Sequence, residues 1–506
     1  MKDRGKSATR AIPISVAVSV ALAGCALGPN YHRPAAPKAA GYTAGPLRSP
    51  AAVPGLAGGA AQRFVSGRAI PAEWWRLFHS RSLDRLIKEA LVANPDLKAA
   101  KAALTQAREL ALAEGAVLYP SVTGSLSDSR QKINDAAAGN ANYSQYMSLA
   151  NASISVGYVL DVFGGQRRAI EAATAQAAVK RYQVRAAYLS LTANLASAVI
   201  REAGVASQIK ATRAILAAER DQLVLIRRQF ALGATASDAV LAQEGIVAAT
   251  RATLPPLQNQ LAQLRHQVAA LTGRLPGEGK AEPVTLADLT LPADLPVSLP
   301  SQLVRQRPDI AAAAANLHAA DANLGVAIAN QFPHFTLSAG FGRNASDIDG
   351  LILPSATVMN FGAGITQTLF DAGQLHHRRK AAAAAVTEAA QQYRSTVLTA
   401  FRNVADALRA IESDGAALKD QAAAENIARK RLILARTQYR LGAVSYLALL
   451  DAERTYDQTR IGVVQAEAAR FTDTVALFQA LGGGWWTHGA APATPASDTH
   501  ASAKGE

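Results

Sequence analysis

Residues 230–234 read Phe-Ala-Leu-Gly-Ala, and residues 439–443 read Tyr-Arg-Leu-Gly-Ala, 209 positions later. An earlier pair of motifs repeats in the same order: residues 94–96 read Asn-Pro-Asp, and residues 307–309 read Arg-Pro-Asp, 213 positions later. The offset changes by only four positions between the two pairs, so a whole series of elements is duplicated. A period this long is far beyond that of a solenoid repeat. The sequence therefore predicts two large, similar halves.

The composition favours helices and argues against one class of partner. Aromatic residues make up 6% of the 506 residues, whereas alanine is abundant, which favours helices packed at close range. The formal net charge is +14, which would suit nucleic acid or anionic lipid head groups. The Lys and Arg residues are spread thinly, with no run of five or more. We therefore expect no nucleic-acid partner.

The first 25 residues predict a secreted, lipidated chain. A basic start leads into an apolar run at 11–24, which is too short to span a bilayer and indicates a signal peptide over 1–24. Its end, Leu-Ala-Gly-Cys25, resembles the bacterial lipobox, which implies cleavage before Cys25 and a covalent N-acyl and S-diacylglycerol lipid on that residue. This lipid is the only cofactor expected, and the lone cysteine leaves no intramolecular disulfide. Ala26 follows the cysteine, where an aspartate tends to retain lipoproteins in the inner membrane, so the lipobox resemblance points to the outer membrane.

Long helices dominate the rest of the chain. Residues 164–232 and 372–441 contain no proline and few glycines, and each predicts one helix of about 100 Å at 1.5 Å per residue. Helices of that length suggest coiled coil. Four shorter helical stretches have lengths that match one long helix when two of them stack end to end. The expected pairs are 234–272 with 301–331, and 80–118 with 443–481.

Segments rich in alanine, proline and glycine divide the chain. Residues 25–72 are expected to form a lipidated, extended linker, and 274–300 a connector at the junction of the stacked helices. The tail 487–506 is expected to be disordered. The first structural repeat is therefore expected over 73–273 and the second over 301–486.

Four short stretches alternate apolar with small polar residues, the pattern of strands with one apolar and one polar face. Half-buried strands of a soluble sheet would alternate in the same way. The Ser, Thr, Gly and Asn of the polar face suit a wet lumen, however, and about ten tilted residues cross a membrane. Four strands cannot close a barrel, so we expect eight strands from two chains or twelve from three. The strands lie near 121–127, 152–160, 334–342 and 359–369, with polar loops at 128–150 and 343–358.

Several motifs together resemble the TolC-like outer-membrane factors of the NodT/OprM lipoprotein type. The resemblance covers nearly all of 22–486 and implies an α+β membrane protein that is internally duplicated. It implies a homotrimer in which four strands per chain form a 12-stranded outer-membrane β-barrel, continuous with a long periplasmic α-helical barrel. The motifs are Gly-Pro-Asn-Tyr-His-Arg-Pro at 28–34, Trp74-Trp75, Gln-Arg-Pro-Asp-Ile at 306–310, Leu-Phe-Asp-Ala-Gly at 369–373 and the stretch 439–452.

The same resemblance implies the outer-membrane channel of a tripartite efflux system, which exports drugs or other small molecules. Its partners would be outer-membrane lipid, a periplasmic adaptor (membrane fusion protein) and an inner-membrane pump of the RND type, which selects the substrate. The alternatives are an outlet for type I protein secretion and, less favoured, a periplasmic adaptor lipoprotein. We expect no enzyme and no metal site. The adjacent His376 and His377 cannot both face one metal, and with Arg378 and Arg379 they better fit a basic belt facing lipid head groups or the lumen.

Glycine turns mark two tips and a candidate gate. Gly233 and Gly442 interrupt helical runs, and the resemblance makes them the periplasmic tips where the adaptor docks. Leu447, Asp451 and Arg454 fall on one helix face just past the second tip. The resemblance implies that they line the closed periplasmic aperture, with Leu447 as an apolar constriction and Asp451 as an acidic ring that favours cations. A plain Asp451–Arg454 salt bridge beside a packing leucine is the simpler interpretation.

Overall fold

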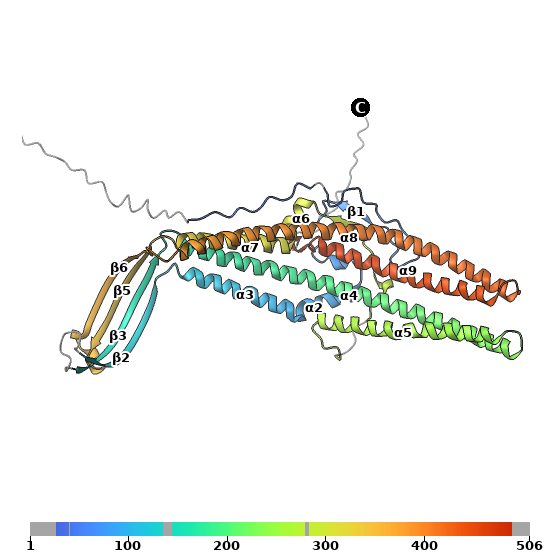
Figure 1. Ribbon diagram of the computed structural model, residues 1–506, viewed down its shortest axis with the longest axis horizontal. Coiled ribbons are helices and arrows are strands. Elements are labelled where there is room, and N and C mark those ends of the chain that lie inside the picture. The colour runs from blue at the N-terminus through green and yellow to red at the C-terminus, as the bar shows by residue number, and fades with distance from the viewer. Residues whose placement is uncertain (1–26, 40, 135–143, 279–282, 488–506) are drawn as a thin grey trace, which may run out of the picture. The chain divides into compact units, whose positions relative to one another are not determined.

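The computed structural model describes residues 27–39, 41–134, 144–278 and 283–487. Figure 1 labels helices and strands of this part of the chain. The chain divides into two compact units, and each unit draws on both halves of the sequence. The first contains the N-terminal segment to Pro34 with Ala102–Arg181 and Ala312–Ser395, and the second contains Ala35–Lys101, Tyr182–Ala311 and the chain from Thr396. Within the described residues, no helix combines the length and the apolar character that a membrane span requires.

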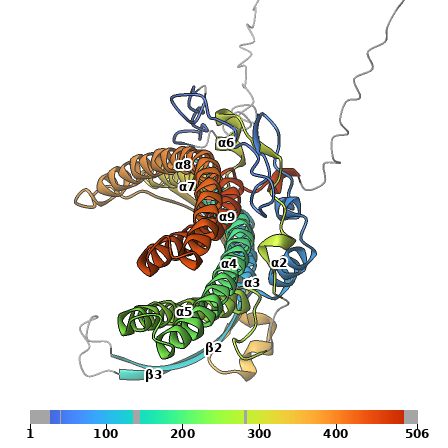
Figure 2. The ribbon, with the colours of Figure 1, turned by 90° about the vertical axis from the view of Figure 1, so that its right-hand side faces the viewer.

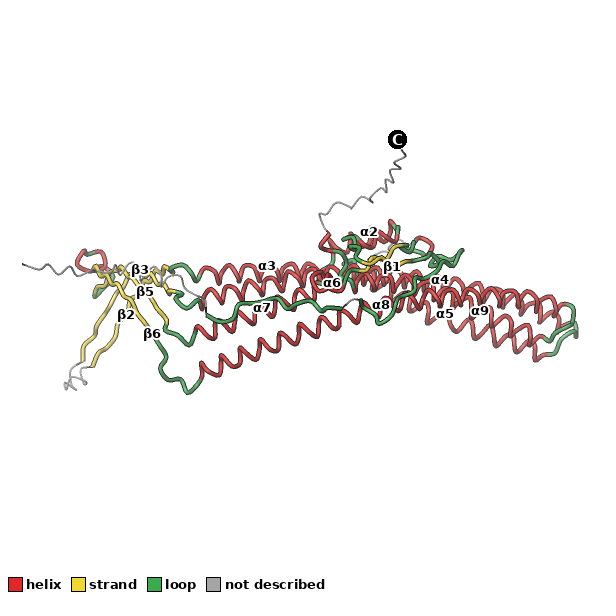
Figure 3. The backbone as a smooth tube through the Cα atoms, turned by 90° about the horizontal axis from the view of Figure 1, so that it is seen from above, coloured by secondary structure: helices red, strands yellow, loops and turns green. Residues whose placement is uncertain are grey.

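The first unit holds a four-stranded antiparallel sheet in the order β2-β3-β5-β6 (Figure 1), whose strands are yellow in Figure 3. Small hydroxyl side chains pair across the first two strands, with Thr123 Oγ1 3.0 Å from Ser155 Oγ and Ser125 Oγ 2.8 Å from Ser153 Oγ. Among the described residues of one chain, no strand pairs with the outer edge of β2 or of β6. The strands are β2 (Ser121–Asn134), β3 (Ser144–Leu160), β5 (His334–Ala345) and β6 (Thr357–Thr366).

The strands depart from their expected ends. Residues 128–134 and 144–150 were expected to be loop, but they continue β2 and β3, with Asp128 opposite Ala150. The alternation is lost there, yet the strands persist because side chains pair across them, as Arg130 and Lys132 do over the ring of Tyr146. At the other end of the sheet, β6 stops at Thr366, three residues before its expected end.

The helices come in three matched lengths, one of each in either half. The two longest have 67 residues, the next two 35 and the next two 22. They are α4 (Gly165–Ala231) and α8 (Gln374–Arg440), α5 (Ser237–Leu271) and α9 (Tyr446–Ala480), and α3 (Pro95–Ala116) and α7 (Pro308–Ala329). The remaining elements are α2 (Arg81–Ala93), α6 (Pro300–Gln306), β1 (Arg63–Ser66), β4 (Asp294–Val297), η1 (Trp74–Phe78), η3 (Leu286–Asp288), η4 (Asp349–Ile352), η5 (Pro354–Ala356) and η6 (Trp485–Thr487).

Two expected helices are broken by proline. The stretch 80–118 divides at Asn94 and the stretch 301–331 divides at Arg307, each just before a proline. Both residues have extended backbone, with ψ of 125° at Asn94 and 126° at Arg307. A residue before proline avoids the helical conformation because the proline ring would clash with it. The Asn-Pro-Asp and Arg-Pro-Asp motifs are therefore helix starts.

The expected pairing of stacked helices is wrong. In the second unit, Asn94 Nδ2 donates to the carbonyl oxygen of Leu271, the last residue of α5, at 3.1 Å. Arg307 Nη1 donates to the carbonyl oxygen of Ala480, the last residue of α9, at 2.7 Å. The start of α3 therefore meets the end of α5, and the start of α7 meets the end of α9. Each stacked pair of helices therefore comes from one half of the sequence. At each of these joints, a side chain just before the start of one helix donates to a carbonyl that the end of the other helix leaves unpaired.

An aromatic core anchors the second unit beside these joints. Trp74 and Trp75 are almost fully buried and meet edge to face, with ring centroids 6.0 Å apart. Phe471 and Phe478 of α9 pack on the same cluster. Trp75 Nε1 donates to Asp84 Oδ1 at 3.0 Å, which satisfies its polar atom. The parallel pair β1 and β4 joins the linker to the connector at 283–300 in this unit.

Candidate channel tips and gate

Both tip turns have the same backbone geometry. Gly233 has φ of 74° and Gly442 has φ of 70°, a left-handed conformation that favours glycine. Ala234 N donates to Gln229 O at 2.8 Å, and Ala443 N donates to Gln438 O at 2.9 Å. These six-to-one hydrogen bonds are those of a Schellman motif, which ends α4 and α8. A Cβ atom at either glycine would meet nothing within 4 Å, so the conformation alone requires glycine.

An exposed leucine precedes each tip glycine. Leu232 is 76% exposed and Leu441 is 78% exposed. Both lie where the α4–α5 and α8–α9 hairpins of the second unit turn, at the helix ends seen in Figure 2. The duplicated turns therefore present apolar side chains at equivalent places, which suits docking of a partner.

Two tyrosines tie the hairpins to each other. Tyr439 Oη of α8 donates to Gln229 Oε1 of α4 at 3.4 Å, and Tyr446 Oη of α9 donates to Gln243 Oε1 of α5. Gln243 is fully buried, and its Nε2 donates to the carbonyl oxygen of Glu219 at 2.9 Å. Burial raises the pKa of Tyr446, so this hydroxyl remains a donor. The hairpins are therefore held together through buried polar contacts as well as packing.

The candidate gate residues share the solvent-exposed face of α9. Leu447 is 75% exposed, and Asp451 and Arg454 are also exposed. Their neighbours Leu449 and Ala452 are buried and pack against α8. The structure therefore places the three predicted gate residues on one face, away from the core. Which way this face points in an assembly stays a prediction.

Asp451 is paired, but with a different arginine from the one expected. Arg431 Nη2 of α8 lies 2.5 Å from Asp451 Oδ2, with both side chains more than half exposed. Among the described residues, Asp451 forms its ion pair with Arg431 on the neighbouring helix and none with Arg454. The gate carboxylate is thus held by its own hairpin.

The second tip carries one ion pair more than the first. Arg227 with Glu244 and Arg436 with Glu453 are equivalent pairs, with charged atoms 2.7 Å and 3.2 Å apart. The positions equivalent to Arg431 and Asp451 hold Gln222 and Ala242. The additional pair therefore distinguishes the gate hairpin from its duplicate.

A buried acidic cluster lies behind the gate face and was missed by the sequence reasoning. Burial, reinforced by the charges of Glu219 and Glu453, raises the pKa of Asp457 to about 7. Burial also raises the pKa of Glu453, against its ion pair with Arg436, and that of Glu219, which accepts from Thr250 Oγ1 at 2.7 Å. Glu453 and Asp457 are four residues apart on α9, so the sequence shows that they share a helix face. The sequence does not show that this face is buried.

A second pair of carboxyls lies nearer the aromatic core. Burial and a hydrogen bond to Asp473 raise the pKa of Asp414 to about 7, while the charge of Arg470 lowers it. Arg470 is buried and donates to Ala60 O and Gln62 Oε1, both at 3.0 Å. This guanidinium fastens the linker to α9, so the carboxyl pair lies next to a structural anchor.

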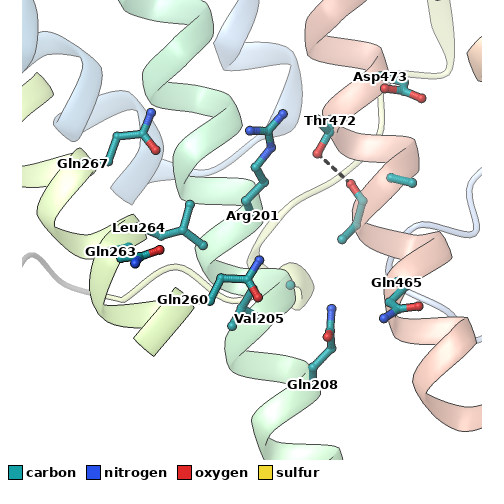
Figure 4. A pocket seen from close by; sticks show the side chains of 13 residues that line it. Arg201, Val205, Gln208, Gln260, Gln263, Leu264, Gln267, Gln465, Thr472 and Asp473 are labelled. Atoms are coloured by element: carbon teal, nitrogen blue, oxygen red, sulfur yellow. Dashed lines mark hydrogen bonds between the residues drawn. The ribbon is translucent and has the colours of Figure 1, made fainter. Parts of the chain in front are cut away.

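Asp473 also lines a polar groove in the second unit. Figure 4 shows side chains from α4, α5 and α9 that face a common space, and the groove has a volume of about 550 Å³. Its wall is mostly amide, with one arginine and one carboxylate among the polar groups. Such a wall suits hydrated solutes more than catalysis. The labelled polar residues are Arg201, Gln208, Gln260, Gln263, Gln267, Gln465, Thr472 and Asp473.

Cys25 lies outside the described residues, but the segment that follows it is firmly seated on the first unit. Leu27 N donates to Phe163 O at 3.2 Å. Arg168 is buried, and its guanidinium donates to Leu27 O at 3.2 Å and to Asn30 Oδ1 at 2.8 Å. Glu171 balances its charge at 2.7 Å. The start of the linker is therefore fixed beside the junction of β3 and α4.

A family of known proteins matches this chain twice, once in each half. The family model described as outer membrane efflux protein matches residues 86–274 and 299–483, one match in each half. The cation efflux system protein CusC of Escherichia coli O6:H1 is 31% identical over 472 residues, covering 92% of this chain and 97% of CusC. The pyoverdine export outer membrane protein OpmQ of Pseudomonas aeruginosa is 30% identical over 460 residues, covering 88% and 94%.

Solved structures agree with these relatives. The outer-membrane channel OprN superposes with a TM-score of 0.81 at 28% identity, covering 91% of this chain and all of OprN. The open state of the Neisseria gonorrhoeae MtrE outer membrane channel gives a TM-score of 0.78 at 25% identity, covering 91% of this chain and 99% of MtrE. The similarity thus extends over both units and both halves.

Proposed function

The chain belongs to the outer membrane efflux protein family, and on that premise we propose that it is an exit duct kept closed at its second tip until an adaptor and a pump engage it. Its function as an outer-membrane efflux channel, and its location in the outer membrane with a periplasmic extension, are confirmed by these relatives. So is the fold class predicted from the sequence, a trimeric barrel of twelve strands continuous with a helical barrel. The partners, the gate and the lipid are the proposal.

A homotrimer is supported by the open edges of the sheet. In the part of the chain that the structure describes, β2 and β6 each leave one edge without a neighbouring strand, and an unpaired edge cannot remain in lipid. Pairing β6 of one subunit with β2 of the next satisfies both edges. Leu232 and Leu441, the exposed leucines beside Gly233 and Gly442, support these turns as docking sites for a periplasmic adaptor. The adaptor would connect the channel to an inner-membrane pump of the RND type.

We propose that the pump, and not the channel, selects the transported substrate. Relatives with about 30% identity carry names for three different cargoes: CusC for a cation, OpmQ for pyoverdine and TtgC of Pseudomonas putida for toluene. Near-equal similarity to all three favours a channel whose wall discriminates little. We propose export of drugs or other small molecules.

The gate proposal rests on the Arg431–Asp451 ion pair, which the first tip lacks. This pair holds one carboxylate at the surface of the second hairpin, one helical turn from the exposed Leu447. In a trimer, three copies of Leu447 would form an apolar constriction and three of Asp451 an acidic ring, which favours cations. Arg454 would line the same aperture.

Single-channel conductance in planar bilayers tests the gate. The purified trimer with Leu447→Ala and Asp451→Ala is expected to conduct several times more than the parent protein, because the constriction widens. Asp238→Ala is the matched control, since Asp238 occupies the position equivalent to Leu447 in the first hairpin. If the double variant conducts like the parent, the gate lies elsewhere, whereas a double variant that inserts into the bilayer but forms no channel would contradict the proposed function itself.

The lipid proposal has its own test. The lipobox that ends at Cys25 supports a lipid on that residue, and Leu27, the first described residue, is held by Phe163 O beside the end of β3. Metabolic labelling with palmitate is expected to label the parent protein and not Cys25→Ser. Equal labelling of both would show that any acylation is on another residue.

A further inference from the structure

The helix that follows the last strand begins with a run of cationic side chains that the fold leaves unpaired. Residues 376–380 read His-His-Arg-Arg-Lys, and all five are exposed. In the described part of the chain, no acidic side chain forms an ion pair with Arg378, Arg379 or Lys380. The nearby Asp371 is engaged by the backbone N–H groups of Gly373, at 2.9 Å, and Leu375, at 2.7 Å. Arg378, Arg379 and Lys380 therefore remain available to an external anion.

The duplicated position in the first half behaves differently. With the offset of 209 between α4 and α8, residues 376–380 correspond to 167–171, which read Arg-Arg-Ala-Ile-Glu. Arg167 pairs with Asp161 at 3.1 Å, and the buried Arg168 is bound to Glu171 and to the linker. The first-half cations thus serve the fold, whereas those of the second half remain available for an external anion.

Several features place this run at a membrane surface. β6 ends at Thr366, and Leu369 and Phe370 between it and α8 are 93% and 88% exposed. At the neighbouring strand ends of the same unit, the rings of Phe163 and Phe332 lie 4.8 Å apart. Aromatic girdles mark the boundary of the apolar band in membrane barrels. The run starts within the first turn of α8, so it lies just beyond that boundary, at the depth of lipid head groups.

Helix geometry selects the cation that faces outward. Tyr393 on α8 is buried and lies near the charge of Arg33 in the N-terminal segment, and we infer that the face covered by this segment is the outer one. Arg379 precedes Tyr393 by 14 positions, close to four turns at 3.6 residues per turn. It therefore lies about 40° from that face, whereas Lys380 lies about 140° away and His377 on the opposite side.

We propose that Arg379, flanked by Arg378 and by the apolar pair Leu369-Phe370, forms a binding surface for the phosphate of anionic phospholipids in the inner leaflet of the outer membrane. A guanidinium binds phosphate through two parallel hydrogen bonds. The apolar pair suits the adjoining acyl chains. The proposal rests on the sheet lying in the outer membrane, and it is independent of the gate.

Native mass spectrometry of the detergent-purified trimer, titrated with phosphatidylglycerol or phosphatidylcholine, tests the surface. Arg379→Gln is expected to weaken phosphatidylglycerol binding about fivefold, the effect of one cation near an anionic lipid surface, with phosphatidylcholine binding unchanged. Lys380→Gln removes an equal charge one position along and is the matched control. Equal loss in both variants would overturn the outward assignment, and no loss in Arg379→Gln would overturn the proposal.

Two further measurements separate the alternatives. Inorganic phosphate at millimolar concentration is expected not to compete. Competition that Arg379→Gln abolishes would indicate a free-anion site and contradict lipid binding. Single-channel recordings of Arg379→Gln are expected to retain the parent conductance and ion selectivity. A shift in ion selectivity with unchanged lipid binding would place the side chain in the lumen and overturn the proposal, without touching the channel function.

Discussion

Raising the pH from 5.5 to 7.5 is expected to loosen the helix packing around Asp457. Burial and the charges of Glu219 and Glu453 raise the pKa of this carboxyl to about 7, against the lowering effect of Arg460 and Arg436. In the unfolded chain, its pKa would be about 4. The folded state therefore binds the proton more tightly. The resulting stabilisation is complete below about pH 4 and is lost as the pH rises through about 7.

The size of the effect follows from the difference between the two pKa values. Three units correspond to about 4 kcal/mol in a desolvated site, and partial exposure of Asp457 reduces this to on the order of 2 kcal/mol. About half of the proton-linked change falls between pH 5.5 and 7.5. Local opening around α9 should therefore become more favourable by about 1 kcal/mol, or roughly fivefold.

Hydrogen exchange of the amides in 446–460, corrected for intrinsic rates at each pH, measures this opening. Asp457→Asn is expected to weaken the pH dependence, because it keeps the shape of the side chain without its charge and leaves only the raised pKa values of Glu219 and Glu453. Asp414→Asn is the matched control, since that carboxyl also has a pKa of about 7 but lies beside Asp473. The reasoning fails if Asp457→Asn shows the same pH dependence as the parent protein.

Three further predictions concern the joints and the tips. Arg307→Gln should lower the free energy of unfolding by about 3 kcal/mol, because it removes a buried cation bound to two carbonyl groups and a carboxylate, and an unchanged thermal midpoint would contradict this. Gly233→Ala and Gly442→Ala should each cost about 1 kcal/mol in a denaturant titration, through strain at positive φ alone, whereas a loss several times larger would mean that a side chain is also excluded by contacts. Arg431→Gln should leave the open probability in planar bilayers unchanged, because the Arg431–Asp451 pair lies within the α8–α9 hairpin and does not break when the hairpin moves as a unit, whereas a clear increase would mean that α8 and α9 separate on opening.

The sequence predicted the elements better than their partners. Proline-free runs and period-two alternation depend on local chemistry, so α4 and α8 begin and end within two residues of the expected positions. Which short helices stack was inferred from length alone, and length does not identify which helix end meets which start. The information was present in the duplication: Gly273 and Gly482 both follow a short helix, 209 positions apart. A Cβ atom at Gly273 would meet Ala93 O at 3.0 Å and one at Gly482 would meet Arg307 Cα at 3.5 Å, so each glycine lies where two helices of its own half meet.

The buried acids could not be predicted for a different reason. Glu453 and Asp457 lie on one helix face in any model of α9, but acidic pairs at this spacing are usually solvated. Their burial depends on Glu219, more than 200 positions away on α4, and on how closely the two hairpins pack. Only the tertiary structure establishes that proximity, and with it the raised pKa. The same holds for Arg431, whose choice of Asp451 depends on the register of α8 against α9.

The contacts at the tips indicate how the gate hairpin could move. The Arg431–Asp451 and Arg436–Glu453 pairs both join α8 to α9, so they travel with the hairpin and resist its separation into single helices. The bonds from Tyr439 to Gln229 and from Tyr446 to Gln243 instead join one hairpin to the other. A rigid-body displacement of α8–α9 breaks only the tyrosine bonds, at about 1 kcal/mol each. Six such bonds in a trimer amount to about 6 kcal/mol, which is about the differential binding energy that moves a two-state equilibrium from almost fully closed to almost fully open. Binding energy from an adaptor seated on the exposed tip leucines is of that order, so the tip can remain closed alone and open on docking.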